Sequence, residues 1–334
     1  MKRVLITGGG GYIGSHAVKY FLEHQCEVVV IDNFSRGFHQ PLDLLKNVGS
    51  LKVYEADLTS FDALLKVFEE NEIDTVLHFA AFLSVDESVK HPELYFKNNV
   101  GGTLNLLEAM RVTGVNKLVF SSSCSVFGES QYLPIDEQHP LQPINPYGES
   151  KLICEKMIRW YVQAHHFRAI SLRYFNVCGA SSDGLIGDSK RPSPHLVQNL
   201  VRGAMGITPF HLTCPTVDTP DGTPIRDYID IEDLTAAHYL AFEYLQHHDG
   251  FEAFNLGNGK GYSVKEMLTQ VEQIFQVKIQ AEKDNQPRQG EYAAVYADPS
   301  KAKRMLGWEV HRSLAESIQS LQKWYDKHPQ GYDY

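Results

Sequence analysis

Residues 3–16 read RVLITGGGGYIGSH, and this stretch decides the fold. A short apolar run is followed at once by four glycines and then by a helical pattern. In the spacing G-x-x-G-x-x-G, Gly8 allows a tight turn, Gly11 lets a pyrophosphate approach the backbone, and Gly14 allows close helix–strand packing. The helix N-terminus attracts the negative charge of such a group. The stretch therefore predicts a strand, a dinucleotide-binding turn and a helix.

The ends of the next strands support this interpretation. A second expected strand ends in Asp32, where a carboxylate accepts from ribose hydroxyls and repels a 2′-phosphate, so NAD is favoured over NADP. We interpret Arg36 as a surface residue rather than a phosphate ligand. Asp57 follows the third strand, in a place where a carboxylate can meet the adenine amino group. Phe79 and Ala80 end the fourth strand as further cofactor contacts, although core packing alone would also explain them.

Strand-like and helix-like segments alternate along the first part of the chain. We expect strands at residues 3–7, 27–31, 51–55, 75–79, 117–121 and 169–174. Helical patterns lie between them, near residues 13–24, 60–70, 92–113 and 147–165. This alternation is typical of βαβ units and predicts a doubly wound, Rossmann-like α/β fold whose parallel sheet has about six or seven strands.

The pattern changes after about residue 176, where Gly, Ser, Pro and Asp become frequent. Shorter elements are expected there: strands near 208–213 and 251–256, and helices at 195–205, 231–246, 263–275 and 313–327. We therefore expect a Rossmann domain in residues 1–176, to which later segments return. Residues 177–334 would mainly form a smaller α/β part that binds the substrate.

Composition excludes several classes of protein. The 334 residues carry 31 Lys+Arg and 41 Asp+Glu, a formal net charge of −10, which argues against binding to nucleic acid or to an anionic membrane. An apolar run of about 18 residues, as a membrane-spanning helix requires, is not found. The five cysteines are widely spaced, without C-x-x-C, and there is no H-E-x-x-H. We expect no disulfide framework, no metal site and a reducing cytoplasm.

A second group of residues carries chemistry. Ser123 follows the fifth expected strand, and Asn145 and Pro146 are typical of the start of a helix. Tyr147 and Lys151 then lie one turn apart on one helix face. A Tyr that acts as a base near neutral pH needs its pKa lowered by about 3 units, and an ammonium and a nicotinamide ring nearby would both favour phenolate. These residues predict hydride transfer between a carbinol carbon and NAD, with Tyr147 moving the hydroxyl proton.

The motifs T-G-G-x-G-Y-I-G-S-H, D-N, F-S-S-S, N-P-Y-G-x-S-K, R-Y-F-N and R-D-Y-I resemble the extended short-chain dehydrogenase/reductases. Within them, the chain resembles the UDP-glucose 4-epimerase family over essentially its whole length. The resemblance implies that UDP-glucose and UDP-galactose, and also their N-acetylated forms, are interconverted through a 4-keto intermediate. It implies that Tyr147 takes the 4-OH proton, Ser123 hydrogen-bonds the reacting oxygen, and Lys151 holds the nicotinamide ribose and lowers the pKa of Tyr147. It also implies a homodimer joined by the helices at 92–113 and 147–165.

The resemblance also assigns binding residues. In addition to the positions above, it implies cofactor contacts at Tyr12, Ile13, Asn33, Leu58, Asn98, Ser121 and Phe175. Near the substrate pyrophosphate it places Asn176, Arg226 and Arg288, and near the uridine ribose Glu291. The remaining substrate contacts that it suggests are His195, Leu196, His211 and Thr213. The wall beside the nucleobase departs from the family pattern at residues 210–214, and Leu83 stands where some members carry a cofactor-binding lysine.

Val295 bears on the choice of sugar. It matches a gate position that the resemblance describes as a bulky Tyr in members limited to non-acetylated sugars and as smaller in members that accept N-acetyl sugars. A smaller side chain leaves volume for an acetamido group at C2. The sequence therefore predicts activity on UDP-N-acetylglucosamine as well as on UDP-glucose.

Other functions remain alternatives. A nucleotide-sugar dehydratase needs an acid–base carboxylate pair after the catalytic strand, where this chain has Cys124 and Ser125. A 4-epimerase of UDP-glucuronate stays open, because it differs in charge recognition at the sugar C6. A plain dehydrogenase would release its cofactor at each turnover. A non-catalytic NAD-binding sensor or scaffold would usually lack the Tyr or the Lys, and both are present as Tyr147 and Lys151.

Overall fold

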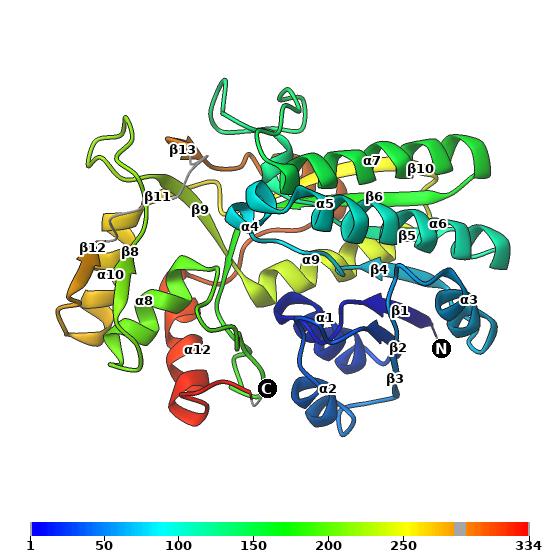
Figure 1. Ribbon diagram of the computed structural model, residues 1–334, viewed down its shortest axis with the longest axis horizontal. Helices are drawn as coiled ribbons and strands as arrows, with labels where there is room; N and C mark the ends of the chain where they lie inside the picture. Colours follow the sequence, from blue (N-terminus) through cyan, green and yellow to red (C-terminus); the bar gives the residue numbers. More distant parts are fainter. Residues whose placement is uncertain (1, 284–291, 333–334) are drawn as a thin grey trace.

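A computed structural model of the chain describes residues 2–283 and 292–332. Its centre is a seven-stranded sheet in the order β10-β6-β5-β4-β1-β2-β3, in which all neighbouring strands are parallel (Figure 1). The doubly wound, Rossmann-like prediction is therefore confirmed. The strands are β1 Arg3–Thr7, β2 Glu27–Asp32, β3 Leu51–Glu55, β4 Thr75–His78, β5 Lys117–Ser121, β6 Arg168–Tyr174 and β10 Gly250–Leu256.

The strand order reverses at β1, and this reversal fixes where a ligand binds. From β1 the chain continues outward to β2 and β3, whereas β4, β5 and β6 lie on its other side. Thr7, the last residue of β1, pairs with Ile31 of β2 and with His78 of β4. In open parallel sheets the crevice beyond the carboxyl ends of the strands, at such a switch point, is the ligand site.

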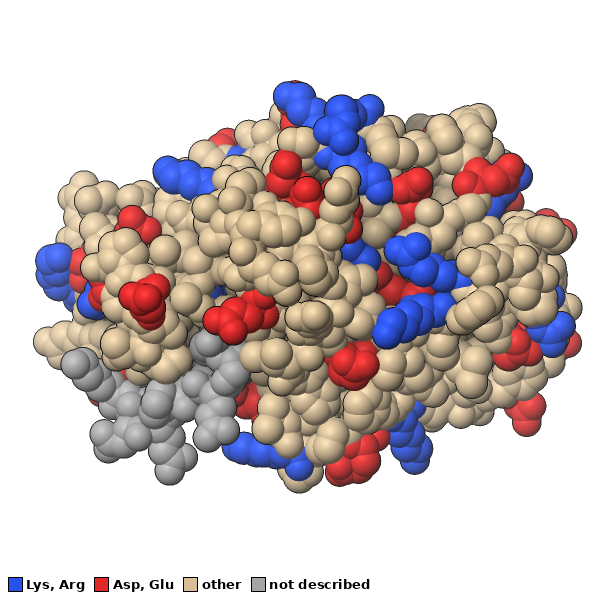
Figure 2. Space-filling view, turned by 90° about the horizontal axis from the view of Figure 1, so that it is seen from above, with Lys and Arg blue, Asp and Glu red and all other residues tan. Residues whose placement is uncertain are grey.

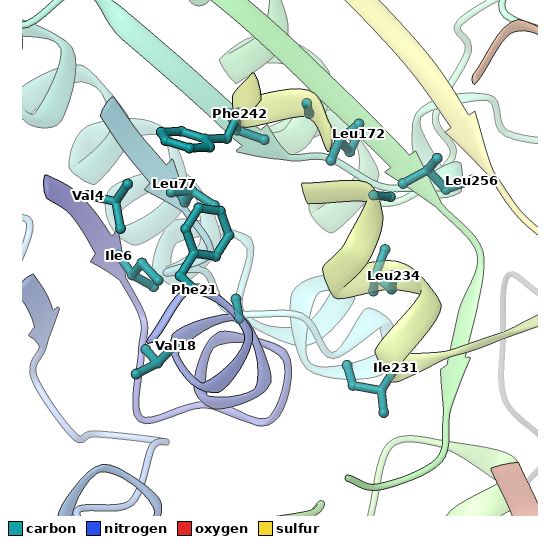
Figure 3. Packing of buried hydrophobic residues seen from close by; sticks show 14 of the residues in the cluster. Val4, Ile6, Val18, Phe21, Leu77, Leu172, Ile231, Leu234, Phe242 and Leu256 are labelled. Atoms are coloured by element: carbon teal, nitrogen blue, oxygen red, sulfur yellow. The ribbon is translucent and has the colours of Figure 1, made fainter. Parts of the chain in front are cut away.

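Helices cover both faces of the sheet. On one face α1 and α9 pack through Val18, Phe21, Ile231, Leu234 and Phe242 onto strand residues such as Val4, Ile6 and Leu172 (Figure 3). On the other face α3, α6 and α7 bury a second apolar cluster that includes Leu64, Leu107 and Ile158. These helices are α1 Tyr12–Glu23, α3 Phe61–Glu69, α6 Gly102–Thr113, α7 Pro146–His165 and α9 Ile231–Tyr244.

A smaller part built from later residues lies beside the large sheet (Figure 1). Its core packs α8 Leu196–Ala204, α10 Val264–Phe275 and α12 Leu314–Lys327 around Trp324 and Tyr325. A small sheet runs β11-β9-β13, with β7 paired to β9, and β8 pairs with β12. Between these segments α9 and β10 return to the large sheet, and the division near residue 176 stays a prediction. The short strands are β7 Asn176–Cys178, β8 Phe210–Leu212, β9 Ile225–Asp230, β11 Gly261–Ser263, β12 Ala281–Lys283 and β13 Ala294–Val295.

The helix expected at 92–113 is divided. A π-helical turn, η1, separates α5 from α6 and contains Asn98 and Asn99. The amide nitrogen of Asn99 donates to the Phe82 carbonyl and to the Ser150 hydroxyl, so this side chain binds α7 and the loop after β4. Hydrogen bonds to distant residues leave no periodic pattern in the sequence, so the division of this helix could not be predicted. The bounds here are α5 Pro92–Tyr95 and η1 Phe96–Gly101, and the other short helices are α2 Gln40–Leu45, α4 Val85–Lys90, η2 Cys124–Val126 and α11 Ser300–Leu306.

The charged residues are mixed on the face that Figure 2 shows, with Lys and Arg interspersed among Asp and Glu. No single sign of charge dominates this face, although the whole chain carries a formal net charge of −10. In the described ranges 2–283 and 292–332, none of the helices is long and apolar enough to cross a membrane.

Candidate active site

The glycine loop connects β1 to α1 at the switch point of the sheet. Gly8 has a φ of +73°, and a Cβ there would lie 2.7 Å from the backbone nitrogen of Ala80. A Cβ on Gly14 would lie 2.0 Å from the Gly8 carbonyl oxygen, so the helix can approach the strand only without a side chain. The Gly8 N–H donates to the Ile31 carbonyl at 2.8 Å, which fixes the turn beside β2. This compact loop at the start of α1 has the shape that a dinucleotide pyrophosphate requires.

The carboxylates expected around the adenosine lie beside this loop. Asp32 accepts hydrogen bonds from the backbone N–H groups of Gly10 and Phe34, each at 2.8 Å. Burial raises its pKa, and these two hydrogen bonds offset part of the increase. The Asn33 amide donates to Asp57 at 2.7 Å. Although burial alone would raise the pKa of Asp57, hydrogen bonds from Thr59 and Asn33 lower it, so this carboxylate is ionised at neutral pH.

The other predicted cofactor residues lie on several different elements of the fold. Phe79 packs against the His238 ring at 4.7 Å, and Ala80 donates its N–H to the Thr7 hydroxyl at 3.3 Å. Leu58 is buried near Gly102. The remaining ones occupy the first turn of α1 (Tyr12 and Ile13), the turn η1 (Asn98) and a buried cluster after β6 (Phe175). Their contact with a cofactor stays a prediction, but the loop, the carboxylates and these small or apolar neighbours fit a dinucleotide.

Ser123, Tyr147 and Lys151 meet beyond the end of β5. Asn145 caps α7 by accepting the Gly148 N–H at 2.8 Å, and Pro146 occupies the first turn, as expected. The Ser123 hydroxyl lies near the Tyr147 phenol and lowers its pKa. The Lys151 ammonium donates to the Ser121 carbonyl at 2.7 Å. The helix can come this close because Gly148 lacks a side chain, since a Cβ there would lie 2.4 Å from the Ser125 carbonyl oxygen.

Burial dominates the electrostatics of these groups. It raises the pKa of Tyr147, with further increases from Tyr174 and Cys124, and the hydrogen bond with Ser123 lowers it only in part. Burial lowers the pKa of Lys151 to about 8. With these protein groups alone, the phenol keeps its proton at neutral pH and Lys151 stays mostly protonated. The expectation that Lys151 lowers the pKa of Tyr147 stays a prediction, because here its ammonium binds Ser121.

A buried charged network that no sequence motif predicts lies behind the catalytic residues. Glu155 accepts from the Ser122 hydroxyl at 2.6 Å and from two nitrogens of Arg173 at 2.9 and 2.6 Å. Both charged side chains are 1% exposed. The guanidinium also lies 5.2 Å from the centre of the Phe127 ring. The network joins β5, α7 and β6 next to Ser123, although the three residues share no motif.

The substrate side is built around β9. Arg226 donates to the carbonyl groups of Ile225 and Tyr292, at 2.8 and 2.9 Å, and pairs in register with Val295 of β13. The Asn176 amide reaches the Asp227 carbonyl at 3.3 Å. Val295 is 3% exposed and packs in one buried cluster with Phe127 and Phe175. Two of the predicted pyrophosphate residues, Asn176 and Arg226, therefore share one small sheet with the gate position Val295.

The other predicted substrate residues lie on α8, on β8 or outside the described ranges. His195 directly precedes α8, and the centre of its ring lies 5.5 Å from that of Tyr12, with Leu196 next to it. His211 on β8 is half exposed and lies 3.4 Å from Glu282, away from the catalytic group in the fold, with Thr213 just beyond. Arg288 and Glu291 fall outside the described residues. In the part that the structure describes, no group of His, Cys, Asp and Glu is arranged to hold a metal ion.

The model of the NAD dependent epimerase/dehydratase family matches residues 4–257. The chain belongs to this family. The UDP-glucose 4-epimerase of Lactobacillus helveticus is 40% identical over 333 residues, which cover 99% of both chains. The resemblance to the UDP-glucose 4-epimerases that the sequence motifs indicated is therefore confirmed.

Solved structures of the family superpose on the chain. The crystal structure of UDP-glucose 4-epimerase from Bifidobacterium longum in complex with NAD+ and UDP has a TM-score of 0.95 and 35% identity, covering 99% of this chain and 100% of that one. The UDP-Glc/GlcNAc 4-epimerase of Campylobacter jejuni has a TM-score of 0.83 and 35% identity, covering 98% and 100%.

The Glu155 network predicts a specific pattern of stability. Glu155→Leu leaves the Arg173 charge buried without a partner and should lower the free energy of unfolding by about 3–5 kcal/mol. The double variant Glu155→Leu/Arg173→Met should recover most of this loss, because no charge remains buried. Urea denaturation measures both. Glu309→Ala, which breaks an exposed pair with Lys303, serves as the control and should not shift the midpoint. A double variant as unstable as the single one would contradict the prediction.

Proposed function

We propose that this chain interconverts UDP-glucose and UDP-galactose by epimerisation at C4, with NAD as the cofactor. The observation that carries the proposal is the meeting of Ser123, Tyr147 and Lys151 beyond β5, beside a loop shaped for a dinucleotide. Relatives that are UDP-glucose 4-epimerases align over the full chain, which supports this substrate. The small sheet with Arg226 and Asn176 offers the place for the UDP pyrophosphate.

The chain's own residues account for proton movement. Bound NAD supplies a hydride acceptor and a positive charge. Tyr147 would take the proton of the sugar 4-OH as C4 gives up its hydride. It would return the proton after the 4-keto sugar has turned and C4 has regained the hydride on its other face, which is general base and then general acid catalysis. Ser123 lies near Tyr147, whose pKa it lowers, and would hold the same substrate oxygen. Lys151, fixed on the Ser121 carbonyl, contributes positive charge that favours the phenolate.

The proposal includes N-acetylated sugars. The family relative from Campylobacter jejuni is a UDP-Glc/GlcNAc 4-epimerase, which supports this wider range. Val295 lies opposite Arg226 and is packed near Phe175, so its size acts directly on the volume of this region. An epimerase of UDP-glucuronate remains the alternative within the same chemistry.

We also propose a homodimer in the cytoplasm. Cys154 and Ile158 are buried toward the sheet, so they do not form the contact surface. Large apolar residues nevertheless remain exposed on η1, α6 and α7, including Phe96, Leu104 and Trp160, of which Trp160 is 69% exposed. Five free cysteines support a reducing compartment, which cell fractionation can check.

The catalytic role of Tyr147 has a direct test. Purified protein is incubated without added NAD, separately with UDP-glucose and with UDP-N-acetylglucosamine, and the products are identified by NMR. Tyr147→Phe should lower turnover by roughly 10²–10⁴-fold because the proton acceptor is lost. NAD content and UDP affinity should stay unchanged. The control Tyr132→Phe removes an exposed phenol and should keep full turnover. If Tyr147→Phe retains turnover, the assignment is wrong.

The size of residue 295 should set the substrate range. Val295→Tyr fills space beside Arg226 and should remove activity on UDP-N-acetylglucosamine before activity on UDP-glucose. Steady-state kinetics on both substrates measure the ratio of kcat/KM. Val295→Ile changes the volume little and should preserve both activities. An equal loss of both activities in Val295→Tyr would reject the gate.

Sedimentation tests the dimer. The wild-type chain, whose mass is 37.8 kDa, should sediment at twice this mass, and Trp160→Glu should give monomers because a charge then replaces a large apolar contact. Met305→Glu, at an exposed apolar residue of α11, is the matched control and should stay dimeric. Wild-type monomers at micromolar concentration would refute the proposal.

A further inference from the structure

A small pocket lies where the glycine loop faces the segment 187–190 of the smaller part. Its lining includes Gly10, Gly11, Arg36, Ser189, Lys190 and Tyr332. Gly10 and Gly11 belong to the loop at the start of α1, so the pocket opens on the place where a dinucleotide pyrophosphate would lie. Two cations, Arg36 and Lys190, are available to this pocket, and their surroundings differ.

Arg36 is already neutralised. Its two terminal nitrogens donate to the two carboxylate oxygens of Glu87 at 2.9 and 2.7 Å. Its guanidinium also lies 4.4 Å from the centre of the Phe82 ring. Such a bidentate pair holds the guanidinium in one orientation. The interpretation of Arg36 as something other than a phosphate ligand agrees with this geometry.

Lys190 is the unpaired cation of the pocket. It is half-buried, and no other residue in ranges 2–283 and 292–332 forms a hydrogen bond or a close ion pair with its ammonium. Burial lowers its pKa, and the more distant Asp188 carboxylate opposes that effect, as do Asp32 and Glu87. An ammonium withdrawn from water without a partner is costly. The cost disappears when an anion enters the pocket.

The segment that carries Lys190 is held in place on both sides. The Lys190 N–H donates to Asp188 at 3.3 Å, and the Tyr332 N–H donates to the Ser189 hydroxyl at 2.5 Å. Arg191 binds the Gln330 side chain at 3.0 Å and the Tyr332 carbonyl at 3.2 Å. Residues 330–332 therefore hold this segment in place, beside the glycine loop with which it lines the pocket. Its backbone is fixed while the ammonium stays free to bind.

We propose that Lys190 binds a phosphate of the dinucleotide cofactor and so closes the smaller part over the glycine loop. The inference rests on the proposed function, because it takes NAD as the occupant of the pocket. A UDP-sugar carries the same pyrophosphate chemistry. The glycine loop that lines the pocket assigns the phosphate to the cofactor, and the test separates the two sources.

The test follows the exchange of bound NAD. Protein loaded with isotope-labelled NAD is diluted into unlabelled NAD, and release is timed at low and at high salt. Lys190→Met should release NAD at least about tenfold faster at low salt, because a charge-assisted contact is lost. High salt should accelerate release from the wild type and change the variant much less. A purely structural role would not alter this salt dependence.

Control variants and a measurement of UDP affinity distinguish a cofactor phosphate from a substrate phosphate. Lys190→Arg should keep slow release, and Lys46→Met, which breaks a surface pair with Asp43, should behave as wild type. Lys190→Gln repeats the test if Lys190→Met does not fold, as judged by circular dichroism. UDP affinity by calorimetry should be unchanged in all variants. Unchanged NAD release, with or without a loss of UDP affinity, would overturn the proposal. Failure of the proposed function would instead appear as wild-type protein that makes no UDP-galactose.

Discussion

The carboxylate of Glu155 fixes the geometry on which the catalytic group depends. Glu155 lies one turn after Lys151 on α7 and binds both Ser122 at the end of β5 and Arg173 of β6. A buried charge can persist only when its partners satisfy it, so neither the helix register nor the strand end can shift without leaving charge unpaired. Because Ser122 lies between Ser121 and Ser123, this constraint sets both the anchor of Lys151 and the hydroxyl that meets Tyr147.

The burial of the catalytic group also opposes the ionisation that Tyr147 needs to act as a base. It raises the pKa of Tyr147 and lowers that of Lys151 to about 8, so both groups are driven toward their neutral forms. A phenolate forms in such a place only when positive charge is added nearby. Bound NAD carries that charge on its nicotinamide ring. NAD would therefore supply part of the electrostatics that Tyr147 needs as a base, as well as the redox chemistry.

Local patterns predicted the large sheet well and the long-range contacts poorly. The strands β1 to β6 are apolar runs between helical patterns, so their type and approximate bounds could be predicted. The G-x-x-G-x-x-G turn and the one-turn spacing of Tyr147 and Lys151 are also local. The π-helical turn at Asn99 and the Glu155 network depend on partners far along the chain, to which no period points. The contact of Tyr332 with Ser189 joins residues 143 apart, and no motif marks Lys190.

A second buried carboxylate, Asp227, holds the substrate side together through backbone hydrogen bonds, whereas Glu155 acts through an ion pair. Asp227 accepts backbone N–H groups from Asn258, Gly259 and Ala297, and burial raises its pKa to about 6. These bonds draw the segments after β10 and β13 against β9, which carries Arg226. Backbone donors fix main-chain position without adding charge, whereas Arg173 brings a full charge beside Ser123. The two sides of the site are therefore held by different kinds of bond. They meet in the apolar cluster where Val295 packs with Phe127 and Phe175, and Arg173 lies against the Phe127 ring on the side of the proton-transfer group.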